Sequence, residues 1–331
     1  MSMNQVYSIH SDFYYVKCGN SILECKLREV LKKRKTQVCT GDFVELEGNI
    51  IKSTLERKNF LKRPSVANID KVAVVSALKE PELDFTQLDR YLTFFKYHNI
   101  PAILCFNKED LNDDTHLKGK IEEIYKLLGY GIFFTSARLG IGIEEFQKSI
   151  KGQTVVLAGQ SGVGKSSILN AIHPSFNLKT SEVSQKHGRG VHTTRHCEII
   201  EFNDIKIVDT PGFSQLRFDF LMPRELDGFF NDIKKYKENC KFSDCLHDES
   251  QNAASCAVIK NMENIHSSRY ESYLTFLSET KEHKAKVTYN GTKVESKVKS
   301  SGGQLRVKIN NKKRADARNT TNQKIKKELD R

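Results

Sequence analysis

Three short motifs occur along this chain in an order that restricts how it can fold. A glycine-rich stretch, Gly159-Gln160-Ser161-Gly162-Val163-Gly164-Lys165-Ser166, matches the loop that binds nucleotide phosphates. Asn107-Lys108-Glu109-Asp110 comes before it, and Asp209-Thr210-Pro211-Gly212 comes after it. In Ras-type nucleotide-binding domains the phosphate loop leads and the Asn-Lys-x-Asp motif trails. The same site can form from either order, provided that the chain is cut at a different loop.

The phosphate loop is the most specific of the three motifs. Its glycines allow backbone N–H groups to close around phosphate oxygens, where a side chain would clash. We expect Lys165 to contact the β- and γ-phosphates and the Ser166 hydroxyl to bind Mg²⁺, while Ser167 lies in the helix that directs its N-terminus at the anion. An apolar strand precedes the loop, as this motif requires. The alternative is a glycine-rich turn without a ligand.

The Asn-Lys-x-Asp motif follows an apolar strand and is predicted to bind the base. The Asp110 carboxylate can accept hydrogen bonds from both N1–H and N2–H₂ of guanine, whereas adenine offers neither donor there. Such a mismatch can discriminate by a factor of about 10⁴. The alternative for Asn107 is a helix N-cap. The residues predicted to bind the base are Asn107, Lys108, Asp110, Ser136 and Ala137, the last two because Thr135-Ser136-Ala137 resembles a motif that contacts the base through backbone N–H groups.

The third motif supplies the Mg²⁺ side of the predicted site. Asp209 is expected to hold the ion directly or through water, and the Gly212 N–H to contact the γ-phosphate. A threonine hydroxyl from the stretch before this motif, Thr193 or Thr194, can complete the Mg²⁺ shell while GTP is bound, as in the order–disorder switch of GTPases. The sequence does not choose between the two threonines.

The residue after the third motif is Phe213, where Ras-type domains have the glutamine that orients water. Phe213 cannot orient water by hydrogen bonding, so another group must do it. His192 is the nearest polar candidate in the sequence, and the alternative for it is a solvated loop histidine. The motifs together predict a circularly permuted GTPase domain with slow intrinsic hydrolysis that a partner accelerates.

The rest of the chain predicts a multidomain protein. Residues 1–65 contain short strands separated by turn signals, which fits an OB-like β-barrel that binds RNA or another small β domain. Residues 66–218 alternate strands with amphipathic helices, which predicts an α/β domain with a mostly parallel sheet. Residues 219–280 are predicted to be helical, and residues 281–331 form a basic tail with few apolar side chains that we expect to be disordered when free.

A cluster of soft ligands predicts one structural Zn²⁺. The cluster lies within 17 residues and consists of Cys240, Cys245, His247 and Cys256. Three thiols and an imidazole fit tetrahedral zinc in a reducing compartment, and the alternative is a set of unligated thiols. The other cysteines show no ligand spacing and are predicted to be reduced thiols.

Composition excludes a membrane protein and points to a polyanionic partner. The chain has no apolar run near the roughly 20 residues that span a bilayer, and its N-terminus lacks the pattern of a signal peptide, so we expect a cytoplasmic protein. The net charge is +12, of which +11 resides in residues 281–331, where 16 basic residues face 5 acidic ones. Charge concentrated in a tail is typical of nucleic-acid binding.

The whole arrangement resembles the ribosome small-subunit-dependent GTPase A family of bacteria over about residues 5 to 280. Besides the phosphate loop, the matching stretches are Gly41-Asp42-x-Val44, Arg57-x-Asn59-x-Leu61-x-Arg63-Pro64, Asn68-Ile69-Asp70, Leu88-Asp89-Arg90-Tyr91-Leu92 and Arg269-Tyr270-x-Ser272-Tyr273. Two features depart from the family pattern. The loop from Asp248 to Ser255 is longer and lacks a Pro-Gly pair, and the basic tail is longer.

The resemblance implies an OB domain, a permuted GTPase domain and a zinc domain in a monomer that binds GTP or GDP, the 30S subunit and its 16S rRNA. It implies a role late in 30S assembly, with GTP hydrolysis stimulated by the subunit and coupled to release. It also implies that Phe213 replaces the usual glutamine and that His192 is the catalytic group. Two other hypotheses are a non-catalytic, GTP-gated rRNA-binding scaffold and an ATP-dependent phosphotransferase, although Asp110 argues against the latter.

We predict that the basic tail adds salt-sensitive affinity for rRNA. Each phosphate contact contributes a slope of about −0.9 in log K against log salt on a duplex, and less on a single strand. Deletion of residues 281–331 should therefore flatten the slope measured by filter binding or anisotropy at several salt concentrations. A slope that is the same with and without the tail would refute this prediction.

Overall fold

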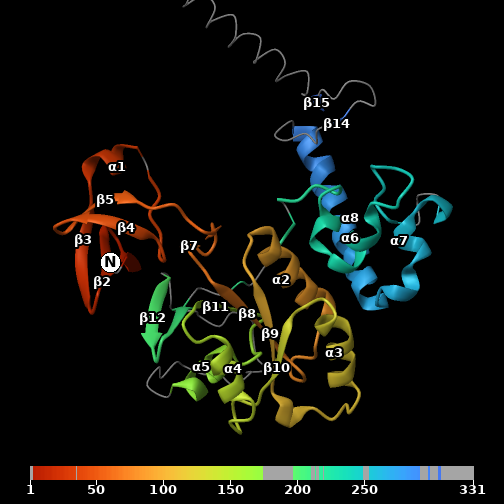
Figure 1. The fold of residues 1–331 in the computed structure, drawn as a ribbon, viewed down its shortest axis with the longest axis horizontal. Helices are drawn as coiled ribbons and strands as arrows, with labels where there is room; N and C mark the ends of the chain where they lie inside the picture. The colour runs from red at the N-terminus through yellow and green to blue at the C-terminus, as the bar shows by residue number, and fades with distance from the viewer. Residues whose placement is uncertain are drawn as a thin grey trace, which may run out of the picture. The chain divides into compact units, whose positions relative to one another are not determined.

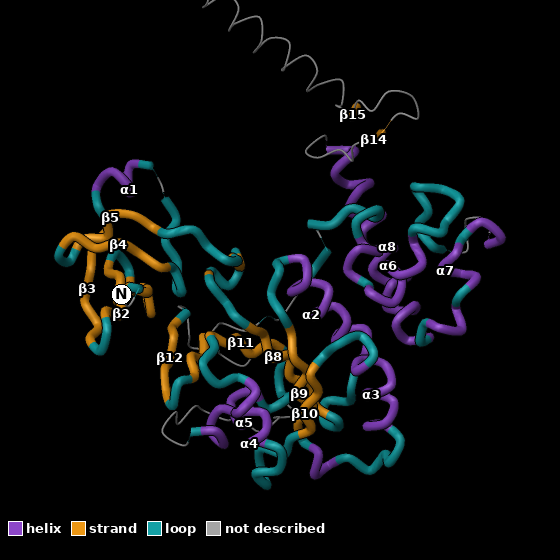
Figure 2. The backbone as a smooth tube through the Cα atoms, viewed as in Figure 1, coloured by secondary structure: helices purple, strands orange, loops and turns teal. Residues whose placement is uncertain are grey.

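The computed structural model describes residues 3–34, 36–173, 197–209, 213, 216–218, 220–248, 253–290, 297–298 and 305–306 (Figures 1 and 2). Its contacts divide the chain into two compact units, Met1–Leu216 and Arg217–Arg331. The first unit contains a β-barrel and an α/β domain, and the second is helical. In the described residues, no helix combines the length and the apolar character that crossing a bilayer requires.

The N-terminal strands form a small closed barrel, as the sequence predicts. Its strands are β1 (Asn4–His10), β2 (Phe13–Cys18), β3 (Ser21–Leu27), β4 (Phe43–Glu47) and β5 (Ile50–Thr54), and a short helix, α1 (Glu29–Lys33), follows β3. The strands pair in the order β1-β2-β3-β5-β4, and β4 pairs back with β1 to close the barrel. The pairing of β3 with β5 is parallel, and the other pairs are antiparallel.

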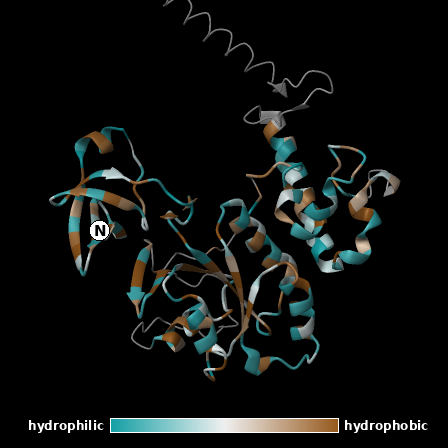
Figure 3. Cartoon of the chain, viewed as in Figure 1, coloured by the Kyte–Doolittle hydropathy of each residue, from teal (hydrophilic) through white to brown (hydrophobic). Residues whose placement is uncertain are grey.

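Alternate side chains of the strands point inward and fill the barrel. Val6, Val16, Cys25, Val44 and Ile51 point inward and form one apolar cluster. Their neighbours along β2, β3, β4 and β5 are more exposed, which is the period-two pattern of a sheet with one buried face, whereas Gln5 and Tyr7 of β1 are buried as well. Figure 3 shows the same alternation of apolar and polar residues along the strands of this barrel.

The α/β domain is a six-stranded sheet within the described residues. The strand order is β10-β9-β8-β11-β13-β12, and all neighbours are parallel except β12 and β13. The strands are β8 (Lys71–Ala77), β9 (Ala102–Asn107), β10 (Gly131–Phe134), β11 (Thr154–Ala158), β12 (Glu198–Phe202) and β13 (Ile205–Asp209). The predicted fold class is therefore confirmed for this domain.

Helices cover both faces of this sheet (Figure 1). One face packs against α2 (Phe85–Tyr97) and α3 (Leu117–Lys126), and the other packs against α4 (Ile143–Ser149) and α5 (Lys165–Ile172). Alternate residues of β8 go to opposite faces: Val72 and Val74 join the first cluster, and Ala73 and Val75 join the second. Both faces of the central strands are buried, which explains why their sequences are continuously apolar.

The helix α2 follows from local sequence signals. Asp84 caps its N-terminus, accepting a hydrogen bond of 3.0 Å from the Gln87 N–H. Leu88, Leu92 and Phe95 are buried and recur at helical spacing, so that one stripe faces the sheet. The helix ends at Tyr97, shortly before Pro101, which cannot continue it.

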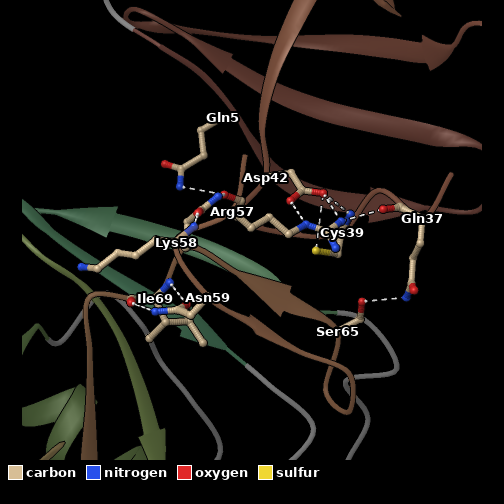
Figure 4. A network of polar contacts seen from close by, with 11 residues as sticks. Gln5, Gln37, Cys39, Asp42, Arg57, Lys58, Asn59, Ser65 and Ile69 are labelled. Carbon is tan, nitrogen blue, oxygen red and sulfur yellow. Dashed lines mark hydrogen bonds and ion pairs between the residues drawn. The ribbon is translucent and has the colours of Figure 1, made fainter. Parts of the chain in front are cut away.

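A polar network joins the barrel to the α/β domain and accounts for several motifs of the sequence (Figure 4). Arg57 binds the fully buried carboxylate of Asp42 through two hydrogen bonds, Nε to Oδ1 at 2.6 Å and a terminal nitrogen to Oδ2 at 2.8 Å. The Cys39 N–H also donates to Asp42, at 2.8 Å. A bidentate guanidinium and a backbone donor offset the cost of burying this charge.

The second half of the network fixes the start of β8. The Asn59 side chain donates to the Ile69 carbonyl at 2.7 Å and accepts from the Ile69 N–H at 2.9 Å. Asn68 donates to the Gly41 carbonyl at 2.9 Å, and Gly41 has no room for a Cβ, which would lie 2.0 Å from the Ala67 carbonyl oxygen. The barrel and the sheet that carries the motifs are therefore joined by directional bonds.

The second unit consists of short helical segments and one long helix. These are η3 (Leu226–Phe229), α6 (Asn231–Lys237), η4 (Ala253–Ser255), α7 (Ala257–Lys260), η5 (Met262–Asn264) and α8 (Ser267–Asn290). The strands β14 (Lys297–Val298) and β15 (Leu305–Arg306) form a two-stranded antiparallel sheet in the same unit. In the first unit, β6 (Phe60–Leu61) and β7 (Val66–Ala67) form another, and η1 (Glu109–Leu111) is a single turn.

The long helix α8 extends beyond the sequence expectation. The sequence predicts helix only to Glu279 and a disordered tail from residue 281, but α8 continues to Asn290. No glycine or proline interrupts this segment before Gly291, and Val287 is buried and in helical register with Thr280, Phe276 and Tyr273. The ten residues from Lys281 to Asn290 are mostly polar, and the buried Val287, in register with the apolar stripe, supports their helical conformation.

Candidate nucleotide site and metal centre

The phosphate loop lies between β11 and α5, in the strand–loop–helix context that its motif requires. Gly159 has a φ of +149°, and a Cβ there would lie 2.1 Å from the Val75 carbonyl oxygen. Gly164 has a φ of +94°, and its Cβ would lie 2.2 Å from the Asn107 Nδ2 atom. These two positions accept only glycine, so the loop can wrap closely with its backbone N–H groups available to an anion.

Asn107 connects the two motifs that are reversed along the chain. It ends β9, and its side chain is 2% exposed. The Nδ2 group donates to the Val163 carbonyl of the phosphate loop at 2.9 Å, and Oδ1 accepts from the Ala137 N–H at 3.1 Å. The base-binding segments and the phosphate loop, which are far apart in sequence, therefore meet at one carboxyl edge of the sheet.

Asp110 and Ser136 lie together beside Asn107. The Ser136 hydroxyl donates to Asp110 Oδ1 at 2.6 Å, which orients the carboxylate. Lys108 adopts a left-handed conformation with a φ of +61°, and its ammonium group bonds to the Glu80 carbonyl. A tight turn fixes Ser136, because its N–H donates to the Ile141 carbonyl at 3.0 Å. The Ser136 hydroxyl thus fixes the orientation of the Asp110 carboxylate beside the phosphate loop's partner, Asn107.

Lys165 is the cation of the phosphate loop and is held over it. Its ammonium group donates to the carbonyls of Gly159 and Gln160 at 2.9 and 2.7 Å. Burial lowers the pKa of Lys165 to about 8. The side chain is therefore charged at neutral pH but poorly solvated, and a phosphate group placed beside it would raise its pKa again.

Several residues that are predicted to bind Mg²⁺, to contact the γ-phosphate or to act in catalysis lie outside the described residues. They are His192, Thr193, Thr194 and Gly212, together with the side chain of Asp209. The Asp209 backbone ends β13, where it is paired with Glu198 of β12. The phosphate loop, with Ser161 and Gly162, follows β11, and Ser166 and Ser167 lie in the first turn of α5. Because β11 and β13 are neighbours in the sheet, the segment that carries Ser166 follows a strand adjacent to the one that ends at Asp209.

Phe213 is anchored in the apolar core beside α2. It is 3% exposed, and its ring centroid lies 5.3 Å from that of Phe95 and 6.4 Å from that of Phe94. The buried Tyr91 hydroxyl donates to the Phe213 carbonyl at 2.9 Å. The sequence did not predict that Phe213 packs against α2, although the apolar stripe of that helix indicates a surface on which such a ring could pack. Phe213 is thus held by apolar packing and by one backbone hydrogen bond.

The four predicted metal ligands come together in the second unit. The ligand atoms of Cys240, Cys245, His247 and Cys256 all lie within 4.8 Å of one another. His247 Nδ1 is 3.6 Å from the sulfurs of both Cys240 and Cys256, and these two sulfurs are 4.0 Å apart. Burial raises the pKa of the Cys245 thiol to about 12. Only a cation at the centre could hold this set as thiolates, so the cluster could hold a metal ion.

Supporting residues that the sequence did not assign hold the cluster. The other ring nitrogen of His247, Nε2, lies 3.2 Å from the Asp227 carboxylate, which is itself 2.7 Å from the Lys237 ammonium group. The Tyr270 hydroxyl donates to the His247 carbonyl at 2.8 Å, and that of Tyr273 to the Leu246 carbonyl at 2.9 Å. The two tyrosines belong to the motif Arg269-Tyr270-x-Ser272-Tyr273, which the sequence analysis singled out. No local sequence pattern marks Asp227 as a partner of His247.

The remaining cysteines, Cys18, Cys25, Cys39, Cys105 and Cys197, form no disulfide. In the described residues, the only group of side chains that could hold a metal ion is the cluster above. Burial raises the pKa of both Cys39 and Cys105 to about 12, so these thiols are uncharged at neutral pH. They act as small apolar side chains in the barrel junction and in β9.

We predict that Gly164→Ala weakens GTP binding by at least about tenfold, because the new methyl group displaces Asn107 from the phosphate loop. Gly129→Ala is the matched control: Gly129 has a similar φ of +86°, with nothing within 4 Å of its Cβ position. The control should lose about 1 kcal/mol of stability and bind normally. A fluorescent GTP analogue gives both affinities, and equal affinities would contradict the role assigned to Asn107.

Comparisons with known families agree with this geometry. The family model described as RsgA GTPase matches residues 54–219, and the RsgA N-terminal domain model matches residues 5–54. A model described as 50S ribosome-binding GTPase matches residues 154–288. The "Small ribosomal subunit biogenesis GTPase RsgA" of Alkaliphilus metalliredigens is 39% identical over 297 residues, which cover 86% of this chain and 99% of that protein. The protein of the same name from a Geobacillus species is 38% identical over 294 residues, with the same coverage.

Two solved structures share the fold of this chain. YjeQ from Thermotoga maritima superposes with a TM-score of 0.72 at 35% identity, covering 84% of this chain and 97% of that one. YloQ, described as a circularly permuted GTPase, gives a TM-score of 0.69 at 31% identity, covering 86% and 96%. The permuted motif order, the barrel and the Cys/His cluster thus have one explanation: the chain belongs to the RsgA GTPase family and is a GTP hydrolase.

Proposed function

We propose that this GTPase binds the small ribosomal subunit and assists its late maturation, with hydrolysis stimulated by the subunit and coupled to release. The observation that carries the proposal is Phe213. Its ring is locked against α2, and Phe213 occupies the sequence position of the water-orienting glutamine of a Ras-type domain, while Asn107 joins the two described parts of the nucleotide cradle, the base-binding segments and the phosphate loop. A cradle that binds GTP but lacks this group needs an external trigger. The relatives are named small ribosomal subunit biogenesis GTPases, which supports the small subunit as the partner that supplies this trigger.

The described residues support specific roles at the nucleotide. Asp110, held by Ser136, accepts from the two guanine donors, and Asn107 keeps the base-binding edge against the phosphate loop. Lys165 and the loop N–H groups bind the β- and γ-phosphates. Ser166, Asp209 and one of Thr193 and Thr194 would hold Mg²⁺, which would neutralise charge that develops on the phosphates. His192 orients the attacking water.

We assign the Cys/His cluster to one structural Zn²⁺. Zn–S bonds of about 2.3 Å and Zn–N bonds of about 2.0 Å place tetrahedral ligand atoms about 3.5–3.8 Å apart. The separations of 3.6 and 4.0 Å between the ligand atoms of Cys240, His247 and Cys256 come close to this geometry. Three thiols also favour a soft ion over Mg²⁺ or Ca²⁺.

The partner is the 16S rRNA of the 30S subunit, bound in the cytoplasm by a monomer of this chain. The closed five-stranded barrel of the described N-terminal residues has the form of an OB fold, which commonly binds single-stranded nucleic acid. The basic excess of residues 281–331 adds attraction to phosphate. Barrel, metal centre and tail would then all contact RNA around the GTPase domain.

We predict that purified 30S subunits raise GTP turnover of the wild-type chain and that His192→Ala removes most of this stimulation. A group that positions the nucleophile contributes about 10²- to 10⁴-fold, so the loss should be at least about 100-fold at unchanged GTP affinity. The exposed His116, at the start of α3, provides the control: His116→Ala should behave as wild type.

Two outcomes of this measurement would overturn different parts of the proposal. Normal stimulation of His192→Ala would exclude His192 from the chemistry. Equal, slow turnover of the wild type with and without subunits would favour a GTP-gated scaffold that binds rRNA without subunit-activated catalysis.

We predict that Asp227→Asn weakens zinc binding by about 10- to 100-fold, because the carboxylate that orients His247 is lost. Asp244→Asn is the control, since Asp244 lies in the same loop but pairs with Arg224 at the surface. Competition against a chelator of known affinity measures both variants. Zinc affinity that is equal in the two variants would show that Asp227 does not support the metal centre.

A further inference from the structure

One phenylalanine of the second unit is placed unlike the others. Phe242 is 50% exposed, whereas every other phenylalanine in the described residues is buried or partly buried. It belongs to none of the apolar clusters, and no other large apolar side chain is exposed in the described part of this unit. An isolated exposed ring is too small for a protein interface, which needs a contiguous apolar patch.

The backbone around Phe242 is fixed. The residue lies in the short loop between Cys240 and Cys245, where the Cys245 N–H donates to the Phe242 carbonyl at 3.2 Å. The Lys241 N–H donates to the Ser255 carbonyl at 3.0 Å, so the loop is also attached to the segment before α7. A ring on a fixed turn loses little conformational entropy when a ligand stacks on it.

A cation accompanies the ring. The Lys241 ammonium group lies 5.7 Å from the centroid of the Phe242 ring. The stretch from Lys234 to Lys241 contains four lysines and one glutamate, so the chain that leads to the ring is strongly basic. An exposed aromatic ring with lysines beside it is the combination that binds an unpaired base together with its backbone phosphate.

We propose that Phe242 and Lys241 form a binding site for one unpaired nucleotide of single-stranded RNA. The base stacks on the Phe242 ring, and Lys241 contacts a neighbouring phosphate. This inference rests on the proposed function in one respect: it takes RNA as the partner of this chain. The inference goes beyond that function because it names two contact residues and the type of contact. An aromatic ring stacks on the face of an unpaired base, which a base-paired duplex does not expose.

The test uses the full-length protein with zinc bound and a short single-stranded RNA that carries 2-aminopurine, whose fluorescence is quenched by stacking. Phe242→Leu keeps an apolar side chain but removes the ring. It should remove part of the quenching and weaken binding by about 5- to 100-fold, the range measured for loss of one stacked base. Phe242→Trp should bind as well as wild type or better.

Lys241→Ala separates the phosphate contact from stacking. It should keep the quenching but reduce the slope of log K against log salt by about 0.7, whereas Phe242→Leu should leave that slope unchanged. Tyr97→Leu is the matched control, because Tyr97 is an aromatic residue of α2 with 37% exposure and no role in the site. Zinc content and circular dichroism confirm that each variant is folded.

The results that would overturn the inference are specific. Equal affinity and equal quenching for the wild type and Phe242→Leu would exclude stacking at this residue. Normal RNA binding by Phe242→Leu together with weaker binding to 30S subunits would assign the ring to a ribosomal protein instead. Failure of subunits to stimulate GTP turnover would count against the proposed function alone, since the RNA measurement does not depend on it.

Discussion

The contact between the Asn107 side chain and the phosphate loop is the interaction on which the rest of the nucleotide site depends. Asn107 Nδ2 donates to the Val163 carbonyl, and the absence of a side chain at Gly164 makes room for it. The same side chain accepts from the Ala137 N–H. One buried amide thus holds three segments whose order along the chain is rearranged. A permuted chain tolerates new ends because these contacts are made by the edge of the sheet, which permutation leaves intact.

The barrel is joined to this edge by bonds that are as specific as those of the site. Asp42 is fully buried and would be costly without Arg57, and Asn59 pairs with both backbone groups of Ile69 at the start of β8. β12, which leads back from the predicted switch stretch, also bridges to β1 at Ser8 and Glu198. The Tyr7 hydroxyl donates to Glu201 at 2.6 Å. The barrel is therefore bonded directly to β12 and to the start of β8, two elements of the GTPase domain.

The sequence predicted those parts that local pattern determines. β9 and β11 are apolar runs that end at a motif, and α2 has both a cap and an apolar stripe, so their existence and type follow from short segments. The fold class and the family were accessible for the same reason. The Asp42–Arg57 pair and the Asp227–His247 pair were not, because their partners are 15 and 20 residues apart and no local pattern links them. The continuation of α8 to Asn290 is supported by the buried side chain of Val287. A single apolar residue among polar ones does not produce a helical pattern that can be recognised in the sequence.

The position of Phe213 connects packing with the control of hydrolysis. Burial of a phenylalanine side chain contributes about 1.5–3 kcal/mol, so the ring will not leave the Phe94–Phe95 pocket without an equal gain elsewhere. The Phe213 carbonyl is also held, because it accepts from the Tyr91 hydroxyl at 2.9 Å. Packing on the α2 side of the sheet therefore fixes the residue that stands in place of the Ras-type glutamine. The start of β12 is joined to the barrel instead, through the pair Ser8–Glu198 and through the Thr40 hydroxyl, which donates to the Cys197 carbonyl at 2.9 Å. We therefore expect a partner that binds the barrel to act on β12 and not on Phe213.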